Sequence, residues 1–110
     1  ERLFDRQFRA AIAYYPFCQR EEPVAVAVPT LILLGELDTW TQARDCRSMV
    51  ERRSALGAPL RLVVYPGAHH AFNLKLPPRN LYGYRLEYNE AADRAAWNET
   101  VDALRQAFGR

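Results

Sequence analysis

Three short apolar segments are spaced along the chain and separated by polar stretches. Residues 10–15 (AAIAYY), 30–35 (TLILLG) and 60–65 (LRLVVY) are nearly continuous apolar runs. Each run is bounded by a proline or glycine that marks a turn, as Pro16 does for the first and Pro29 for the second. Short apolar runs between turn signals are typical of strands that are buried on both faces of a sheet.

Two other segments have the spacing of amphipathic helices. Thr39 and Gln42 form a T-x-x-Q capping box that predicts a helix start, and Gly57 predicts its end. The apolar stripe of this helix consists of Ala43, Cys46, Met49, Val50 and Leu56. A last helix is predicted from Asn89 to Gly109. Its apolar stripe consists of Trp97, Val101, Leu104 and Phe108.

Three remaining stretches show no regular period. Residues 1–9 indicate the end of a polar, partly amphipathic helix or its connector, and residues 21–28 indicate a connection between strands. Residues 73–88 contain two consecutive prolines, so we predict a long irregular loop there. Loops of that length are often functional.

The order strand, strand, helix, strand, loop, helix predicts an α/β fold. Apolar strands that alternate with helices form a parallel sheet whose two faces are covered by helices. A chain of 110 residues is sufficient for one domain, which we assign to residues 1–110. Function in such sheets collects at the carboxyl ends of the strands, which here are residues 16–18, 36–40 and 66–72.

Composition and charge narrow the function classes. Charged residues make up 25% of the chain and the net charge is +2, with acidic and basic residues interspersed. A nucleic-acid partner is not expected, because no concentrated basic stripe is present. A membrane span would need about 18 consecutive apolar residues, and no stretch reaches that length. The start shows no signal peptide. We expect a soluble protein, and a cytoplasmic or a periplasmic location remains open.

Two titratable residues follow neighbouring strands. Asp38 comes after the second strand and His70 after the third, with one helical crossover between them. A right-handed crossover brings such strand ends side by side. A carboxylate in that place can accept the imidazole Nδ1–H, which leaves the other ring nitrogen to face a nucleophile.

Four stretches together resemble one enzyme family. The segments AAIAYYPFC, PTLILLGELDTWT, LRLVVYPGAHHAF and YNEAADRAAW are similar to the C-terminal half of a dienelactone-hydrolase-type α/β-hydrolase. The resemblance assigns the catalytic acid to Asp38 and the catalytic base to His70, which stands two residues before Phe72. It implies hydrolysis of a small-molecule ester or lactone through an acyl-enzyme, without a cofactor.

The resemblance also implies a missing half. The nucleophile of the family, a Cys or a Ser, lies in an upstream G-x-[CS]-x-G turn, and no two glycines of this chain bracket a Ser or Cys. The 110 residues alone are therefore expected to be inactive, with the N-terminal half of the same fold as their partner. The substrate and the nucleophile type remain open.

Further residues at the strand ends have weaker assignments. Phe17, Trp40, His69 and Phe72 either line a substrate pocket or pack in the ordinary way. His69 is not expected to act directly, because neighbouring side chains of an extended chain diverge. For the same reason no metal site is expected, although Glu36 lies nearby.

The two cysteines, Cys18 and Cys46, leave alternatives open. They are either free thiols in a reducing compartment or one bridge in an oxidising one. Cys46 lies on a predicted apolar stripe, and Cys18 lacks the turn that a nucleophile needs. Because both are expected near the carboxyl edge of adjacent strands, a Cys18–Cys46 disulfide is favoured over a nucleophilic role for either.

Two other functions remain open. The chain is alternatively a non-catalytic, truncated hydrolase-fold module with a structural or associative role. Its first strand would then expose an edge, so that it would form a homo-oligomer or bind the missing half. A peptidase or an acyltransferase of the same fold would use the same acid and histidine.

Overall fold

The computed structural model describes residues 8–18, 25–53 and 56–109. Its elements are β1 (Ala11–Tyr14), β2 (Thr30–Gly35), α1 (Ala43–Glu51), β3 (Leu60–Tyr65), β4 (Arg79–Leu81), β5 (Tyr84–Leu86) and α2 (Glu90–Phe108). The predicted helix end or connector at residues 1–9 lies outside the described residues except for 8–9, which are not helical. Of the predicted connection at 21–28, the described part is 25–28, which contains no helix or strand.

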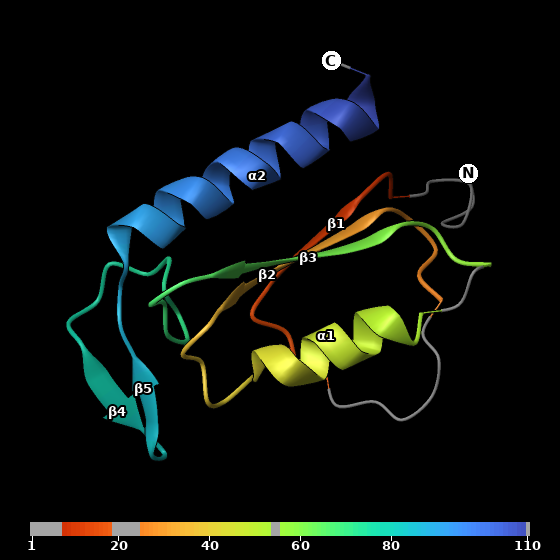
Figure 1. The fold of residues 1–110 in the computed structure, drawn as a ribbon. Helices are drawn as coiled ribbons and strands as arrows, with labels where there is room; N and C mark the ends of the chain where they lie inside the picture. Colours follow the sequence, from red (N-terminus) through yellow and green to blue (C-terminus); the bar gives the residue numbers. More distant parts are fainter. Residues whose placement is uncertain (1–7, 19–24, 54–55, 110) are drawn as a thin grey trace, which may run out of the picture.

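The three predicted strands form one parallel sheet in the order β1-β2-β3. Helix α1 covers one face of this sheet and α2 covers the other (Figure 1). The α/β fold that we expected from the alternation of strands and helices is therefore confirmed.

Strand β2 supplies side chains to both layers of the core. Ile32 and Leu34 pack with α1, whereas Leu31 and Leu33 pack on the side of α2. All four are buried, because successive side chains of a strand point to opposite faces and both faces of this strand are covered. This explains the continuous apolar run that predicted the strand.

Strand β1 differs from its prediction in burial. Its four residues are only half-buried, whereas the apolar run predicted burial on both faces. Among the described residues, β1 pairs with β2 alone, so its outer side has no neighbouring strand. The run therefore reflects a strand with an open edge.

The capping box that we predicted for α1 is wrong. The helix begins at Ala43 with Gln42 at the cap position, and neither Gln42 nor Thr39 caps it with a side chain. Instead, Asp38 accepts the backbone amides of the loop that precedes the helix. The helix also ends earlier than predicted, at Glu51, so Leu56 lies outside its apolar stripe.

The boundaries of α2 agree with the prediction. The Asn89 side chain accepts a hydrogen bond from the amide of Ala92, which caps the amino end of the helix. Gly109 ends the helix in the left-handed conformation, with φ at 71°. Glycine adopts this conformation without a steric penalty, which is why it terminates helices so often.

The apolar stripe predicted for α2 is wrong. The buried residues of the helix are Ala92, Ala96 and Thr100, whose small side chains face the sheet. Trp97 and Phe108, by contrast, are 61% and 56% exposed. The prediction favoured large apolar side chains, but a row of small ones forms the buried face.

The long loop predicted at residues 73–88 contains a hairpin. Strands β4 and β5 pair antiparallel, and Tyr82 and Gly83 connect them. Both connecting residues have positive φ, at 51° and 83°, as the type I′ turn of a two-residue hairpin requires. Strands of three residues are too short to show a period, so the sequence pattern did not reveal them.

Candidate active site

The loops after β2 and β3 are joined along their backbones. The Glu36 amide donates to the carbonyl of Tyr65, and the Leu37 amide donates to the carbonyl of Ala68, both at 2.9 Å. Gly35 permits this approach, because a Cβ at this position would overlap the Ala68 carbonyl. The ends of β2 and β3 therefore hold their following loops side by side.

Asp38 lies in the first of these loops with its carboxylate fully buried. Its Oδ1 accepts the backbone amides of Trp40 and Thr41, each at 2.8 Å. Its Oδ2 accepts the Thr41 hydroxyl at 2.8 Å and lies 2.8 Å from Nδ1 of His70. Both oxygens are thus fixed, and one of them is directed at the imidazole.

These hydrogen bonds determine the charge of Asp38. Burial by itself would raise the pKa of the carboxyl, but the hydrogen bonds from His70 and Thr41 outweigh burial and lower the pKa below its ordinary value. The group is therefore a carboxylate at neutral pH.

His70 lies in the second loop and faces this carboxylate. An ionised carboxylate can only accept, so Nδ1 of His70 carries the proton and donates it to Oδ2 of Asp38. The imidazole Nε2 is then a proton acceptor. This is the tautomer that a general base requires.

The backbone around His70 is held by β5 and by an unusual turn. The Glu87 amide donates to the His70 carbonyl at 3.3 Å, and a β-bridge joins His70 to Leu86. Ala71 then adopts a left-handed φ of 61°, which for an alanine indicates local strain. Across this strained turn, the His70 side chain is directed at Asp38 and the Phe72 side chain into the core.

Of the two roles considered for Phe72, substrate pocket or ordinary packing, the structure shows packing in the core. Its side chain is fully buried in the core between the sheet and α2, where it contacts Tyr14 and Tyr65. Phe72 therefore does not line a pocket of the described chain, because the turn at Ala71 directs it inward. His69 is half-buried beside this turn. The histidine that bonds the Asp38 carboxylate is His70.

The other two pocket candidates, Phe17 and Trp40, have different surroundings. Phe17 is 65% exposed on the loop after β1. Trp40 packs against the imidazole of His70, with ring centroids 4.9 Å apart. Tyr15, which the sequence analysis did not single out, lies even closer to the imidazole at 4.4 Å. Its only signal in the sequence was a polar aromatic residue at the end of a strand.

Cys18 and Cys46 form a disulfide. Cys18 follows the loop that begins at Tyr15, and Cys46 lies on the buried face of α1. The bond therefore ties the carboxyl end of β1 to the helix that follows Asp38. Neither cysteine titrates in this state, so neither is available as a nucleophile.

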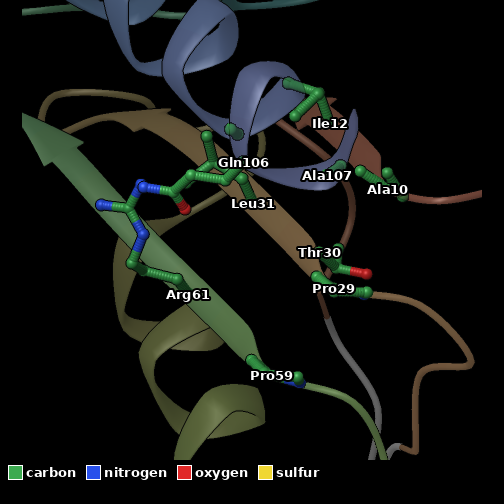
Figure 2. A pocket seen from close by; sticks show the side chains of 11 residues that line it. Ala10, Ile12, Pro29, Thr30, Leu31, Pro59, Arg61, Gln106 and Ala107 are labelled. Atoms are coloured by element: carbon green, nitrogen blue, oxygen red, sulfur yellow. The ribbon is translucent and has the colours of Figure 1, made fainter. Parts of the chain in front are cut away.

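A separate pocket of about 320 Å³ lies at the opposite end of the sheet. Figure 2 shows it between the last turns of α2 and the starts of the strands, where Ile12, Leu31 and Arg61 line it. Asp38 and His70 follow the carboxyl ends of the strands and do not reach it. This pocket is therefore not part of the candidate active site.

Two negative findings apply to the described residues. Across 8–18, 25–53 and 56–109, no three acidic, histidine or cysteine side chains are grouped closely enough to hold a metal ion. Within the same ranges, neither helix has the length and apolarity needed to cross a membrane.

Comparison with known proteins identifies a family. Residues 2–108 match the dienelactone hydrolase family. A Salmonella typhimurium protein, provisionally named a carboxymethylenebutenolidase, is 30% identical over 94% of this chain and 40% of its own length. A Yersinia pestis protein of the same provisional name is 31% identical over 91% of this chain and 39% of its own.

A solved structure has the same fold. The crystal structure of a Klebsiella pneumoniae protein, provisionally titled a dienelactone hydrolase, matches with a TM-score of 0.65 and 26% identity. The match covers 86% of this chain and 40% of the other. The chain thus spans about two fifths of the length of the relatives that it matches.

Proposed function

The chain belongs to the dienelactone hydrolase family, and from that premise we propose that Asp38 and His70 are the acid and base of an ester- or lactone-hydrolysing triad. One observation carries the proposal: the buried Asp38 carboxylate lies 2.8 Å from Nδ1 of His70. This contact fixes the tautomer in which Nε2 can accept a proton.

The proposed reaction uses His70 twice. Nε2 takes the proton of a Ser or Cys nucleophile as that atom attacks the ester carbonyl, and the resulting imidazolium returns the proton to the leaving alcohol. A water molecule then loses a proton to Nε2 as its oxygen attacks the acyl carbon, and the imidazolium passes this proton to the departing Ser or Cys atom, so that the acid is released and the nucleophile and neutral His70 are restored. Asp38 remains ionised throughout and stabilises the imidazolium in both halves.

The nucleophile would come from the part of the fold that the matched relatives have and these 110 residues do not contain. The open edge of β1 is a suitable place for that part, because it presents unpaired backbone groups to another strand. The exposed residues of α2 lie on the same side, since Phe108 packs against Arg9 just before β1. Glu99, on the other flank of the helix, pairs instead with Arg61 of β3.

We call the exposed row on the β1 side the α2 flank. It consists of Trp97, Leu104 and Phe108, which are exposed, and Val101, which is half-buried. Together, the α2 flank and the edge of β1 form an apolar surface with unpaired backbone beside it. A segment that adds a parallel strand and a helix would cover both features at once.

The second candidate is a non-catalytic module. It is favoured by the absence of a G-x-[CS]-x-G turn from the 110 residues. In that case the β1 edge and the α2 flank would bind a partner or a second copy without any chemistry at His70.

Hydrolysis of p-nitrophenyl acetate and of a simple lactone separates the two candidates. The 110-residue chain alone should show only background hydrolysis. The gene product that contains these residues should turn over both substrates and gain the mass of one acyl group when the reaction is quenched. A gene product that shows neither turnover nor acylation would favour the non-catalytic module.

A further inference from the structure

Two aromatic rings contact the imidazole of His70. The Trp40 ring is stacked on it, with a centroid distance of 4.9 Å and an angle of 29° between the planes. The Tyr15 ring lies at 4.4 Å with an angle of 59°. The side chain of His70 is only 15% exposed, so these contacts occur with most of the surrounding water excluded.

Trp40 is held in place from two directions. Its amide donates to Oδ1 of Asp38 at 2.8 Å, so the same carboxylate that faces His70 also fixes the backbone of Trp40. Its ring is stacked on Tyr84 of β5 at 4.8 Å, with only 14° between the planes. The hairpin thus supports the Trp40 ring, and Trp40 in turn contacts the imidazole.

Tyr15 is held by a strained backbone and a hydrogen bond. Its φ of 43° is in the left-handed region, which is unfavourable for a tyrosine. Its hydroxyl donates to Oδ1 of Asn73 at 2.8 Å. This unfavourable backbone conformation places the Tyr15 ring against the imidazole of His70.

We propose that Trp40 and Tyr15 are positioning residues, which hold the ring of His70 and stabilise its protonated form. The inference rests on the proposed function, in which His70 becomes an imidazolium between the two proton transfers. Aromatic faces attract cations, and the attraction grows where water is excluded. The hydrogen bond from Nδ1 to Asp38 fixes only one point of the ring, whereas contacts with its faces limit its rotation.

In the described part of the chain, three elements bring polar or charged groups near His70. Asp38 approaches it from the loop after β2, and Tyr15 approaches from the end of β1. The Thr41 hydroxyl lies 3.3 Å from Nδ1 and is neutral. From β5, Tyr84 stacks on Trp40, and just after β5 the Glu87 carboxylate pairs with Arg85, while the Glu87 amide donates to the backbone carbonyl of His70.

The test is an NMR titration of the two histidines in the 110-residue chain, which contains no others. The imidazole shifts give the protonation midpoint of His70 directly, and His69 serves as an internal reference. In Trp40→Leu the His70 midpoint should fall by about 0.5 to 1 pH unit, because the protonated form loses the aromatic face. Trp40→Phe should retain most of the wild-type value.

The sign of the shift separates the proposal from simple exposure. If Trp40 only shields the ring, its removal would hydrate the imidazolium and raise the midpoint. An unchanged or raised midpoint in a folded Trp40→Leu chain would overturn the proposal. Tyr15→Phe retains the ring and should leave the His70 midpoint within about 0.2 units, whereas Tyr15→Leu should lower it.

A second readout covers variants that fail to fold as an isolated chain. In the gene product, the acid limb of the pH profile of kcat/KM should move to lower pH in Trp40→Leu by the amount measured for the midpoint. No movement of that limb would contradict the proposal. Failure of the proposed function would instead appear as an activity that is independent of His70, while the His70 midpoint would still fall in Trp40→Leu.

Discussion

At the scale of single residues, Asp38 combines a structural and a chemical contact. Its Oδ1 holds the two backbone amides of the loop before α1, and its Oδ2 faces the imidazole of His70. Removing the negative charge would therefore disturb the order of the loop as well as the pair. This dual contact leads to a dependence of stability on pH.

In Asp38→Asn, the acid dependence of stability should be weaker than in the parent chain. Folding lowers the pKa of Asp38 below its ordinary value of about 3.8. The ionised carboxylate therefore stabilises the folded chain at pH values above this unfolded-state pKa. This contribution is lost as the pH falls through the folded pKa. Urea denaturation between pH 2 and 6 should show a difference between the two chains that shrinks in acid. A constant difference would contradict this assignment.

Among the residues that the structure describes, Tyr65 has a buried side-chain oxygen without a hydrogen-bond partner. Its hydroxyl is buried without a hydrogen bond, and burial raises its pKa to about 12. Tyr65→Phe should keep or raise the free energy of unfolding by up to about 1 kcal/mol, because it removes an unsatisfied polar group. Between pH 10 and 12 the variant should also lose less stability, since the raised pKa of Tyr65 opposes ionisation in the folded state. A loss of more than about 1 kcal/mol at neutral pH would indicate a hidden partner.

At the scale of elements, Gly35 determines how closely the loops after β2 and β3 approach each other. In Gly35→Ala the added Cβ would overlap the Ala68 carbonyl, so the two loops should separate. The free energy of unfolding should fall by more than about 2 kcal/mol, which is in the upper part of the range for inserting extra atoms into a packed site. Gly67→Ala is the matched control: its φ is 70°, but nothing lies near its Cβ, so its cost should be only about 1 kcal/mol. Equal losses in the two variants, measured by urea denaturation, would refute the role of the close approach.

The two strands whose bounds the sequence predicted well, β2 and β3, are both marked by runs of apolar residues. Strands β2 and β3 pack apolar side chains along their length, and their bounds match the apolar runs 30–35 and 60–65. The hairpin was missed because its pairing depends on the turn at Tyr82 and Gly83, not on a hydrophobic period. The buried face of α2 was missed because it consists of small residues.

The candidate site was predictable in the same unequal way. Asp38 and His70 follow predicted strands, so the rule that parallel strands end at one edge placed them together. Thr41, Tyr15 and Tyr84 were not predicted, because their roles depend on loop and hairpin conformations that have no sequence period. Backbone strain at Tyr15 is a property of the folded chain and leaves no pattern in the sequence.

At the scale of the whole molecule, the disulfide joins two parts of the fold that carry the site. Cys18 and Cys46 are 28 residues apart, so closing a loop of this size should contribute about 3.6 kcal/mol to stability. Dithiothreitol should lower the urea midpoint of the parent chain and raise its intact mass by two hydrogens. A Cys18→Ala/Cys46→Ala chain should not respond to the reductant. An unchanged mass on reduction would show that the bond does not form.

In the whole molecule, Asp38 and His70 lie at one end of the sheet, and among the described residues the outer edge of β1 has no partner strand. The contact between Asp38 and His70 lies within the described chain, and the 110 residues contain no G-x-[CS]-x-G pattern. Under the proposed function, these residues would supply proton transfer and the rest of the family fold would supply the nucleophile. The two histidines offer a comparison within one sequence.

The most direct test of this central claim compares His70→Ala with His69→Ala in the gene product that contains these residues. The measurement is kcat for p-nitrophenyl acetate, with folding checked by circular dichroism. His70→Ala should lower kcat by at least about a thousandfold, because the general base is lost, and His69→Ala should stay within about threefold of the parent. If His70→Ala retains near-parental turnover, or if His69→Ala loses as much, the assignment of the acid–base pair is wrong.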